Sequence, residues 1–554
     1  MARIVKPDRL TMNLFAPGMS VLHRAGLGGL ACTLKAMERQ AKNGLLPPSK
    51  LPAPFDGDKL PWDIDEQSVT LKFGKPENAK DYLKKLFEFA FTIRKDGLIF
   101  LPGQHTTDPS AAVLADLQTG LTLTFLQHGK VRKLVEEATS VSYDPEGEGV
   151  PGVLVEYRKC TSFKHQIGWK DFVDRQGCLV TGNIKVDGPI SPGTVVRHAA
   201  YSSDTAAKDP PERMLPLYFA IVGTLALPVN RGVAALLVPD VNNLLDFIYD
   251  RPSLTPTTAI DCQVANAADG ALRAQIRLRN DPIRASHIRA KARKAMAGSE
   301  IPGCYAMTFT PTSWANQQKS RVATIFVPPS DDKRLDRFSR ALAHLPPRVQ
   351  TRTLSERTGK GRRKTVSERP EVFRVDSVIR PLIAENLALG RLWYAGFARL
   401  MTAIDPATRK PYRDRILYER KGLHDMMADQ TMWEHAREET IVRAVHEALR
   451  SRYGQIAEEN KNNPAARKNR WKSEYDRWRL AFAGAKTANQ FRRSLCDLFS
   501  RAGNNPVLKE HWQDILPLLR ADCWQQARDL ALLGLCSYAG RGDSEVVEPT
   551  DSTN

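Results

Sequence analysis

The sequence predicts an α+β fold, with a mixed α/β region over residues 1–370, an all-helical bundle over 371–540 and a disordered tail over 541–554. Strand-like runs separated by turn residues predict β-hairpins in the first region, and successive amphipathic patterns predict helices in the second. The 554 residues also exceed what one hydrophobic core covers, so more than one structural unit is expected.

The first clear element is a helix over 79–94, because its apolar residues recur at helical spacing on one face. It ends at Asp96 and Gly97, and a strand over 98–101 follows and ends at Pro102. Further strands are predicted at 121–126, 153–157 and 178–181.

Two hairpins follow. The first pairs 218–227 with 233–238 through a tight turn that holds Asn230 and places Arg231 at its tip. The second pairs 305–310 with 322–327 through a long loop over 311–321, which is uncharged at first and then basic.

Two basic stretches flank the second hairpin. The first stretch, over 273–294, holds eight basic residues against the single acid Asp281. The second, over 348–369, also holds eight, contains two glycines and has almost no apolar residue. We interpret the second stretch as a mobile loop and a domain boundary.

The helical region shows its pattern best near the C-terminus. Phe491, Leu495, Leu498 and Ala502 share one helix face, and residues 503–506 end that helix and start the next. The last helix carries an apolar stripe from Trp524 to Tyr538 and ends at Gly540. The aromatic residues of an earlier helix are expected in the bundle core, and these are Trp471, Tyr475, Trp478 and Phe482.

The charge points to a polyanionic partner. Lysine and arginine number 81 against 62 acids, a net charge of +19, and nucleic acid is the commonest partner of such a surface. The eight cysteines form no C-x-x-C pair, as expected in a reducing cytosol. No secretory signal is evident, and the longest uncharged run, 214–230, is too short to span a membrane, so we expect a cytoplasmic protein without membrane contact.

No catalytic motif stands out. The P-loop, H-E-x-x-H and G-x-S-x-G patterns are absent. His424-Asp425, with His435 and His446, lacks enough converging ligands for a metal site. Paired acids such as Asp63 with Asp65 and Asp331 with Asp332 are typical of caps, and the glycine-rich 26–29 is typical of a close-packing turn. We therefore expect no catalytic residue, no metal and no cofactor.

The basic and amide residues instead predict nucleic-acid contacts. In the second hairpin loop, amide side chains can read base edges, and the tryptophan can stack on bases or fold back on the core. The candidate residues for reading the DNA motif are Trp314, Asn316, Gln317, Gln318 and Lys319. Asn230 and Arg231 are a parallel candidate. Contacts to the nucleic-acid backbone are predicted for Arg289, Lys291, Arg293, Lys294, Lys360, Arg362, Arg363, Lys364, Arg492 and Arg493.

Three segments carry a family resemblance. Residues 22–30 (LHRAGLGGL), 491–503 (FRRSLCDLFSRAG) and 524–540 resemble the large subunits of type I CRISPR effector (Cascade) complexes, in the I-B-like branch that includes the myxan form. The resemblance implies a non-catalytic protein that binds near the 5′ handle of the guide RNA (crRNA). It would recognise the protospacer-adjacent motif in duplex target DNA and promote R-loop formation.

The resemblance also implies partners: the backbone, handle-binding and small subunits of the complex, and a helicase-nuclease or transposition proteins recruited to it. Its bundle would resemble the small subunit. In such a protein base pairing reads the target, and the protein reads only a short motif and the backbone. Two rival interpretations stay open: a nuclease or transposase with an unrecognised carboxylate site, and a standalone RNA-binding factor.

Overall fold

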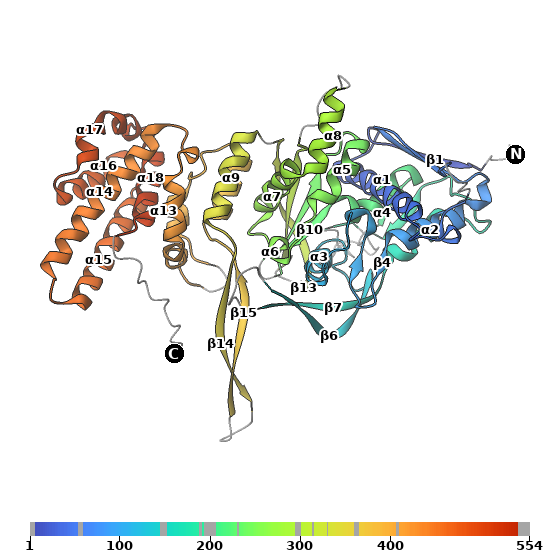
Figure 1. Cartoon of the computed structure of the whole chain (residues 1–554), viewed down its shortest axis with the longest axis horizontal. Coiled ribbons are helices and arrows are strands. Elements are labelled where there is room, and N and C mark those ends of the chain that lie inside the picture. The colour runs from blue at the N-terminus through green and yellow to red at the C-terminus, as the bar shows by residue number, and fades with distance from the viewer. Residues whose placement is uncertain are drawn as a thin grey trace. The chain divides into compact units, whose positions relative to one another are not determined.

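A computed structural model confirms the α+β fold (Figure 1). The structure describes residues 6–53, 59–144, 152–187, 191–192, 206–229, 232–293, 301–312, 315–329, 331–358, 365–405 and 409–540. The chain divides into two compact units. Unit 1 contains Met1–Ser330 and Pro347–Asp376, and unit 2 contains Asp331–Pro346 and Ser377–Asn554. The tail over 541–554 lies outside the described residues.

Unit 1 is built around a four-stranded antiparallel sheet in the order β10-β11-β12-β13. Its strands are β10 (Leu225–Pro228), β11 (Ala234–Pro239), β12 (Cys304–Thr312) and β13 (Ala315–Val327). Every residue of β10 and β11 is buried, because helices such as α1 (Val21–Lys42), α3 (Ala111–Leu123) and α7 (Ala267–Asn280) pack on these strands.

The glycine-rich segment 26–29 lies inside α1, so the predicted turn is wrong although the predicted close packing is present. A Cβ at Gly26 would lie 1.9 Å from the Pro216 carbonyl oxygen, and one at Gly29 would lie 2.4 Å from that of Phe219. Both carbonyls belong to α4 (Pro211–Gly223). The glycines therefore let two helix backbones approach more closely than any side chain would permit.

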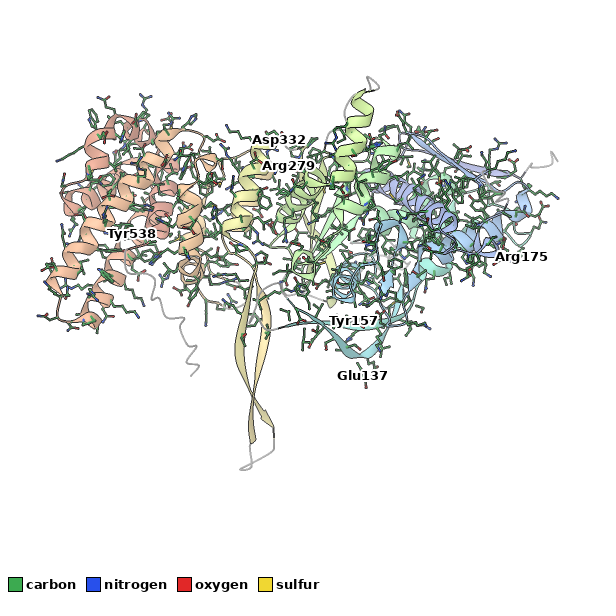
Figure 2. All side chains as sticks on the ribbon, in the orientation of Figure 1. Glu137, Tyr157, Arg175, Arg279, Asp332 and Tyr538 are labelled. Carbon is green, nitrogen blue, oxygen red and sulfur yellow. The ribbon has the colours of Figure 1, made fainter. Side chains whose placement is uncertain are left out.

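Smaller sheets complete the mixed region. β1 (Arg9–Asn13), β2 (Trp62–Ile64) and β3 (Ser68–Lys72) form a sheet in the order β1-β3-β2. The remaining strands of the first 210 residues form two-stranded sheets: β4 (Thr92–Ile93) with β5 (Ile99–Phe100), β6 (Arg132–Tyr143) with β7 (Val153–Phe163), and β8 (Ile184–Asp187) with β9 (Ala206–Asp209). Figure 2 shows Glu137 of β6 pointing away from its hairpin, whereas Tyr157 of β7 is 8% exposed and donates to the Asp96 carbonyl.

Several sequence predictions in this region need correction. The helix over 79–94 is α2 (Ala79–Ala90), which ends before β4. The strands over 98–101 and 153–157 are confirmed as β5 and β7. Residues 121–123 instead end α3, 124–126 form a turn, and 178–181 contributes only one isolated bridge. Residues 218–223 are helical, because α4 begins at a proline in the first turn and extends over them. The errors at 121–126, 178–181 and 218–223 involve short apolar runs, which fit either a strand or a buried helix.

The prediction of a mobile loop over 348–369 is wrong for its described part. β14 (Arg348–Thr358) and β15 (Thr365–Val375) pair along their whole lengths, from Arg348 opposite Val375 to Thr358 opposite Thr365. Figure 1 shows this hairpin as a long ribbon. Threonine and valine recur through it, and β-branched residues favour strands even where few side chains are apolar.

Unit 2 is a helical bundle. Its helices are α9 (Asp332–His344), α10 (Arg380–Ala388), α11 (Phe397–Thr402), α12 (Tyr412–Ile416), α13 (Arg420–Ala428), α14 (Ala436–Glu459), α15 (Pro464–Ala483), α16 (Ala488–Ala502), α17 (Pro506–Ile515) and α18 (Trp524–Ser537). α18 lies at its centre and packs against α11, α13, α14, α15 and α16. None of the helices in the described ranges is long and apolar enough to cross a lipid bilayer.

The predicted C-terminal helices are confirmed. Phe491, Leu495, Leu498 and Ala502 are all buried on α16. Gly503 adopts a φ of 78°, and the side chain of Asn505 accepts a hydrogen bond from the Leu508 amide at the start of α17. Tyr475, Trp478 and Phe482 are likewise buried in the bundle, as expected, whereas Trp471 is only partly buried and donates to the Tyr453 carbonyl at 3.2 Å.

Candidate nucleic-acid interface

The predicted base-reading residues of the second hairpin lie on a strand. Trp314 falls outside the described residues, and Asn316, Gln317, Gln318 and Lys319 lie on β13, so a long loop over 311–321 is wrong. Lys319 pairs with Pro311 and Ala315 pairs with Thr312. The register therefore leaves 316–318 as extra residues opposite no partner on β12, which is the geometry of a bulge.

Asn230 and Arg231 fall outside the described residues, but the strands on each side of them are clear. β10 and β11 form the predicted hairpin, which is closed by a 2.8 Å hydrogen bond from the Val229 amide to the Val233 carbonyl. Gly232 has a φ of 74°, as a tight turn requires.

Both predicted base-reading segments are attached to the same end of the sheet. Pro228 pairs with Ala234, Ala234 pairs with Phe309, and Phe309 pairs with Arg321. The β10–β11 and β12–β13 connections therefore leave the sheet in the same direction, and the second hairpin extends several residues further. That both segments read bases stays a prediction, and only the strand register shows that their connections share one end of the sheet.

Much of the first basic stretch stabilises the protein itself. On α7, Arg273 lies 2.7 Å from Asp261 and 3.6 Å from Asp269, and its side chain is 2% exposed. Arg284, on α8 (Pro282–Arg293), pairs with the buried Asp250 at 2.6 Å. Counting charges along the sequence could not separate these paired arginines from exposed ones.

The remaining predicted backbone contacts of this stretch lie at the end of α8. Arg289 is exposed and donates to the Ser286 hydroxyl at 3.3 Å. Lys291 and Arg293 lie on the last turn of the helix, and Lys294 falls outside the described residues. Their contact with nucleic acid stays a prediction.

The β14–β15 hairpin holds the second basic stretch. Lys360, Arg362, Arg363 and Lys364 fall between Thr358 and Thr365, outside the described residues. The opposite end of the hairpin is anchored by Arg374, whose guanidinium makes two hydrogen bonds to Asp116 on α3, at 2.8 and 2.9 Å. The same guanidinium donates to the Ala259 carbonyl at 2.6 Å.

In unit 2, Arg492 and Arg493 differ in role. Arg492 donates to the Leu519 carbonyl at 2.6 Å and to Asn489 at 3.2 Å, so it holds the chain after α17. Arg493 is exposed on the outer side of α16. Exposed basic residues gather on α15 and α16, and these are Lys468, Arg470, Lys472, Arg477, Arg493 and Arg501.

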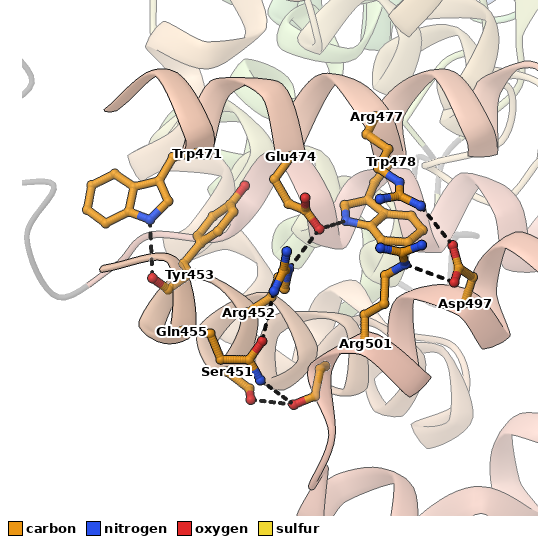
Figure 3. Close-up of polar contacts among 11 residues, drawn as sticks. Ser451, Arg452, Tyr453, Gln455, Trp471, Glu474, Arg477, Trp478, Asp497 and Arg501 are labelled. Atoms are coloured by element: carbon orange, nitrogen blue, oxygen red, sulfur yellow. Dashed lines mark hydrogen bonds and ion pairs between the residues drawn. The ribbon is translucent and has the colours of Figure 1, made fainter. Parts of the chain in front are cut away.

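The acids on these two helices are largely engaged within the bundle (Figure 3). Asp497 lies between Arg477 and Arg501, at 3.2 and 2.9 Å. Glu474 is buried and accepts hydrogen bonds from Arg452 and the Trp478 indole, at 3.1 and 3.0 Å. The outer surface of α15 and α16 is therefore positive, which suits a phosphate backbone.

The residues weighed for catalysis have structural contacts. His424 and His446 stack with ring centroids 5.9 Å apart, and both bond to Ser537. Asp331 caps α9 through the Arg334 amide, and Asp65 accepts from the Gln67 and Ser68 amides. Within the ranges that the structure describes, no three His, Cys, Asp or Glu side chains gather in a way that could hold a metal ion.

A groove in unit 1 also collects basic residues that the sequence analysis missed. Its lining includes Lys35, Arg39 and Lys42 from the end of α1, together with Tyr249 and Arg277. The spacing of four and three along α1 is a signal that could have identified these three as one face of a helix.

Comparisons with known proteins give matches at both ends of the chain and over its full length. A family model described as the DevT N-terminal domain matches residues 11–218, and one described as the DevT C-terminal domain matches residues 429–554. The CRISPR-associated protein Cas8a1/Csx13 of Myxococcus xanthus (strain DK1622) is 35% identical over 575 residues, which cover 100% of this chain and 93% of that relative.

Proposed function

Because the chain belongs to the family of Cas8-type large subunits of CRISPR effector complexes, we propose that it is the non-catalytic subunit that recognises the protospacer-adjacent motif. In this proposal it binds the 5′ handle region of the guide RNA and promotes R-loop formation in the target duplex. It then recruits a helicase-nuclease or transposition proteins to the assembled backbone, handle-binding and small subunits.

The observation that carries motif recognition is the shared end of the β10–β13 sheet. A protein that reads a few base pairs needs its reading side chains held at fixed spacing on a rigid support. The β10–β11 and β12–β13 connections, to which residues 230–231 and 313–319 belong, leave the sheet at the same end, which supports this assignment. We propose that Asn316, Gln317 and Gln318 read base edges, with Asn230 and Arg231 beside them.

The proposed backbone contacts lie elsewhere. The positive outer surface of α15 and α16 supports binding of a DNA strand through phosphates, as do Arg289 at the end of α8 and the basic residues between β14 and β15. Phosphate contacts position a protein on nucleic acid, whereas contacts with base edges give specificity. The two kinds of site thus differ in their expected sensitivity to salt and to sequence.

The decisive experiment compares motif-bearing and motif-less duplexes bound by the assembled complex. The triple variant Asn316→Ala, Gln317→Ala, Gln318→Ala should lose discrimination by about 10- to 100-fold for each base contact that it removes, since each amide–base pair contributes about 1–3 kcal/mol. A matched variant of exposed bundle amides, Asn462→Ala, Asn504→Ala, Gln513→Ala, should retain it. Unchanged discrimination in the first variant would exclude these three amides as the readers.

A further inference from the structure

A groove of about 740 Å³ crosses unit 1 between the end of α1, α5 (Leu244–Leu254) and the junction of α7 with α8. Binding pockets for small ligands span roughly 300–1,000 Å³, and the volume of this groove lies within that range. Four basic side chains line it against two acidic ones, Glu38 and Asp281. The proposed function gives none of these residues a role.

Two arginines of the groove are held by neutral groups. Arg39 donates to the His105 carbonyl at 2.9 Å, and Arg277 donates to the Leu254 carbonyl at 3.2 and 2.8 Å. Neither guanidinium makes an ion pair among the described residues, although the charges of Asp261 and Asp269 act on Arg277 from further away. Burial lowers the pKa of Arg277 to about 10, so it stays charged at neutral pH. Carbonyl contacts do not neutralise a guanidinium, so its charge can still attract an anion.

The lysines add to this positive field. Lys35 and Lys42 both pair with Glu38, at 2.9 and 2.7 Å. Glu38 is 8% exposed, so a single buried carboxylate orders two ammonium groups along one face of α1. Glu38 thus supplies one negative charge beside two ammonium groups at the rim of the groove.

An aromatic ring lies in the same groove. Tyr249 is 42% exposed, and its ring stacks on that of His287 with centroids 4.1 Å apart and an interplanar angle of 21°. His287 is fixed in turn by Asp246 at 3.0 Å. A ring supported from behind in this way presents its other face to a ligand, and exposed aromatic rings are the usual platform for unpaired bases.

We propose that this groove binds an unpaired nucleotide of a single nucleic-acid strand, with its base stacked on Tyr249 and its phosphate held by Arg39 and Arg277. The inference rests on the proposed function in one respect, that the partner is a nucleic acid. It adds a second kind of contact, separate from motif reading on the β10–β13 sheet. RNA and DNA share the chemistry that this site recognises.

The test measures binding of labelled oligo(rU) and oligo(dT) to the full chain by fluorescence anisotropy. Tyr249→Ala should lower the affinity for one or both strands about 10-fold, because the base has no ring to stack on, whereas Tyr249→Phe should retain it. Tyr418→Ala is the matched control, since Tyr418 is 49% exposed and does not line the groove. A loss confined to oligo(rU) would identify guide RNA as the occupant, and one confined to oligo(dT) would identify a DNA strand.

A second measurement does not depend on how the variants fold. Strands carrying 5-iodouracil should photocrosslink to the wild-type chain within α5, as mapped by mass spectrometry, and crosslinks that avoid α5 would overturn the inference. Motif-bearing duplex is titrated in parallel. If Tyr249→Ala binds both strands like wild type while duplex binding persists, only the groove assignment fails. If the wild-type chain binds neither strand nor duplex, the proposed function fails with it.

Discussion

The imidazole of His165 lies among the rings of Phe91, Phe163 and Tyr218, with centroids 5.3 to 5.8 Å away. Neither ring nitrogen has a hydrogen-bond partner among the described residues. Burial lowers the pKa of His165 to about 3, and it lowers the pKa of His105 to about 3 and of His446 to about 4. These histidines are therefore neutral in the native protein at any pH near neutrality.

Because these histidines are neutral in the native protein, we expect its free energy of unfolding to fall in acid. The unfolded chain takes up a proton at each histidine as the pH falls through about 6.5, whereas the native chain does not until about pH 3–4. The free energy of unfolding should thus be highest above pH 6.5 and fall below it, by about 2 kcal/mol per histidine at pH 5. Replacing His165 with leucine should remove its share of this decrease.

Urea denaturation at pH 7 and pH 5 checks this prediction. The difference in unfolding free energy between the two pH values should shrink by about 2 kcal/mol in His165→Leu. His435→Asn, which removes an exposed histidine but keeps a helix-capping side chain, should retain the full difference. An equal pH dependence in the wild type and His165→Leu would contradict the prediction.

Single residues could be predicted from the sequence only where local spacing decides their surroundings. The apolar stripe of α16 is such a case, and so is the close packing of Gly26 and Gly29. The surroundings of Arg273 and Arg284 could not be predicted in this way, because their partners Asp261 and Asp250 lie 12 and 34 residues away along the chain. A basic residue looks the same in the sequence whether its partner is a carboxylate or a phosphate.

At the scale of elements, the β14–β15 hairpin depends on one buried ion pair. Asp116 is 3% exposed, and burial raises its pKa even with Arg374 opposite. Removing one partner of such a pair leaves a charge without compensation, at a cost of about 3–5 kcal/mol, whereas replacing both with apolar residues costs far less. Arg374→Met should therefore destabilise unit 1 by about this amount.

The control for this prediction is the double variant Arg374→Met, Asp116→Leu. Its unfolding free energy, measured by urea denaturation, should lie between those of the wild type and the single variant, because no buried charge is left unpaired. If the single and double variants were equally unstable, packing rather than charge would be the main contribution of Arg374.

The predictability of elements followed the length of their patterns. The helix α16 could be predicted because its periodicity extends over many residues, whereas only the outer parts of the hairpin β12–β13 could be, and its strands continue through the predicted loop. The hairpin β14–β15 was missed because its side chains are mostly polar and charged, and its strand pairing comes from backbone hydrogen bonds and β-branched residues. No local pattern could show that the β10–β11 and β12–β13 turns share one end of a sheet.

At the scale of the whole molecule, the net charge of +19 predicts binding that weakens steeply with salt. Replacing Lys360, Arg362, Arg363 and Lys364 with glutamine should lower the affinity for every duplex sequence alike. The slope of log affinity against log salt concentration should also become less steep, by about 0.9 for each phosphate that the variant no longer neutralises. The measurement is a salt titration of the assembled complex on duplex DNA.

A control with the same charge change separates direct binding from net charge. Lys75, Lys80, Lys84 and Lys95 are exposed lysines of unit 1, and replacing them with glutamine removes the same charge. This second variant should keep the wild-type salt slope. If both variants flattened it equally, the hairpin residues would act through the overall charge of the protein and not by touching the phosphates.

The division of the chain into units has a consequence for synthesis. α9 belongs to unit 2, but 347–376 then return to unit 1 before the rest of the bundle is made. Arg337 of α9 completes its ion pair with Glu434, at 2.6 Å, 97 residues further on. At about 5–20 residues per second, a ribosome needs roughly 5–20 s to add them. Until then the nascent helix lacks part of the packing that buries Leu335 and Phe338 in the finished bundle, because α13 is also made after the return to unit 1.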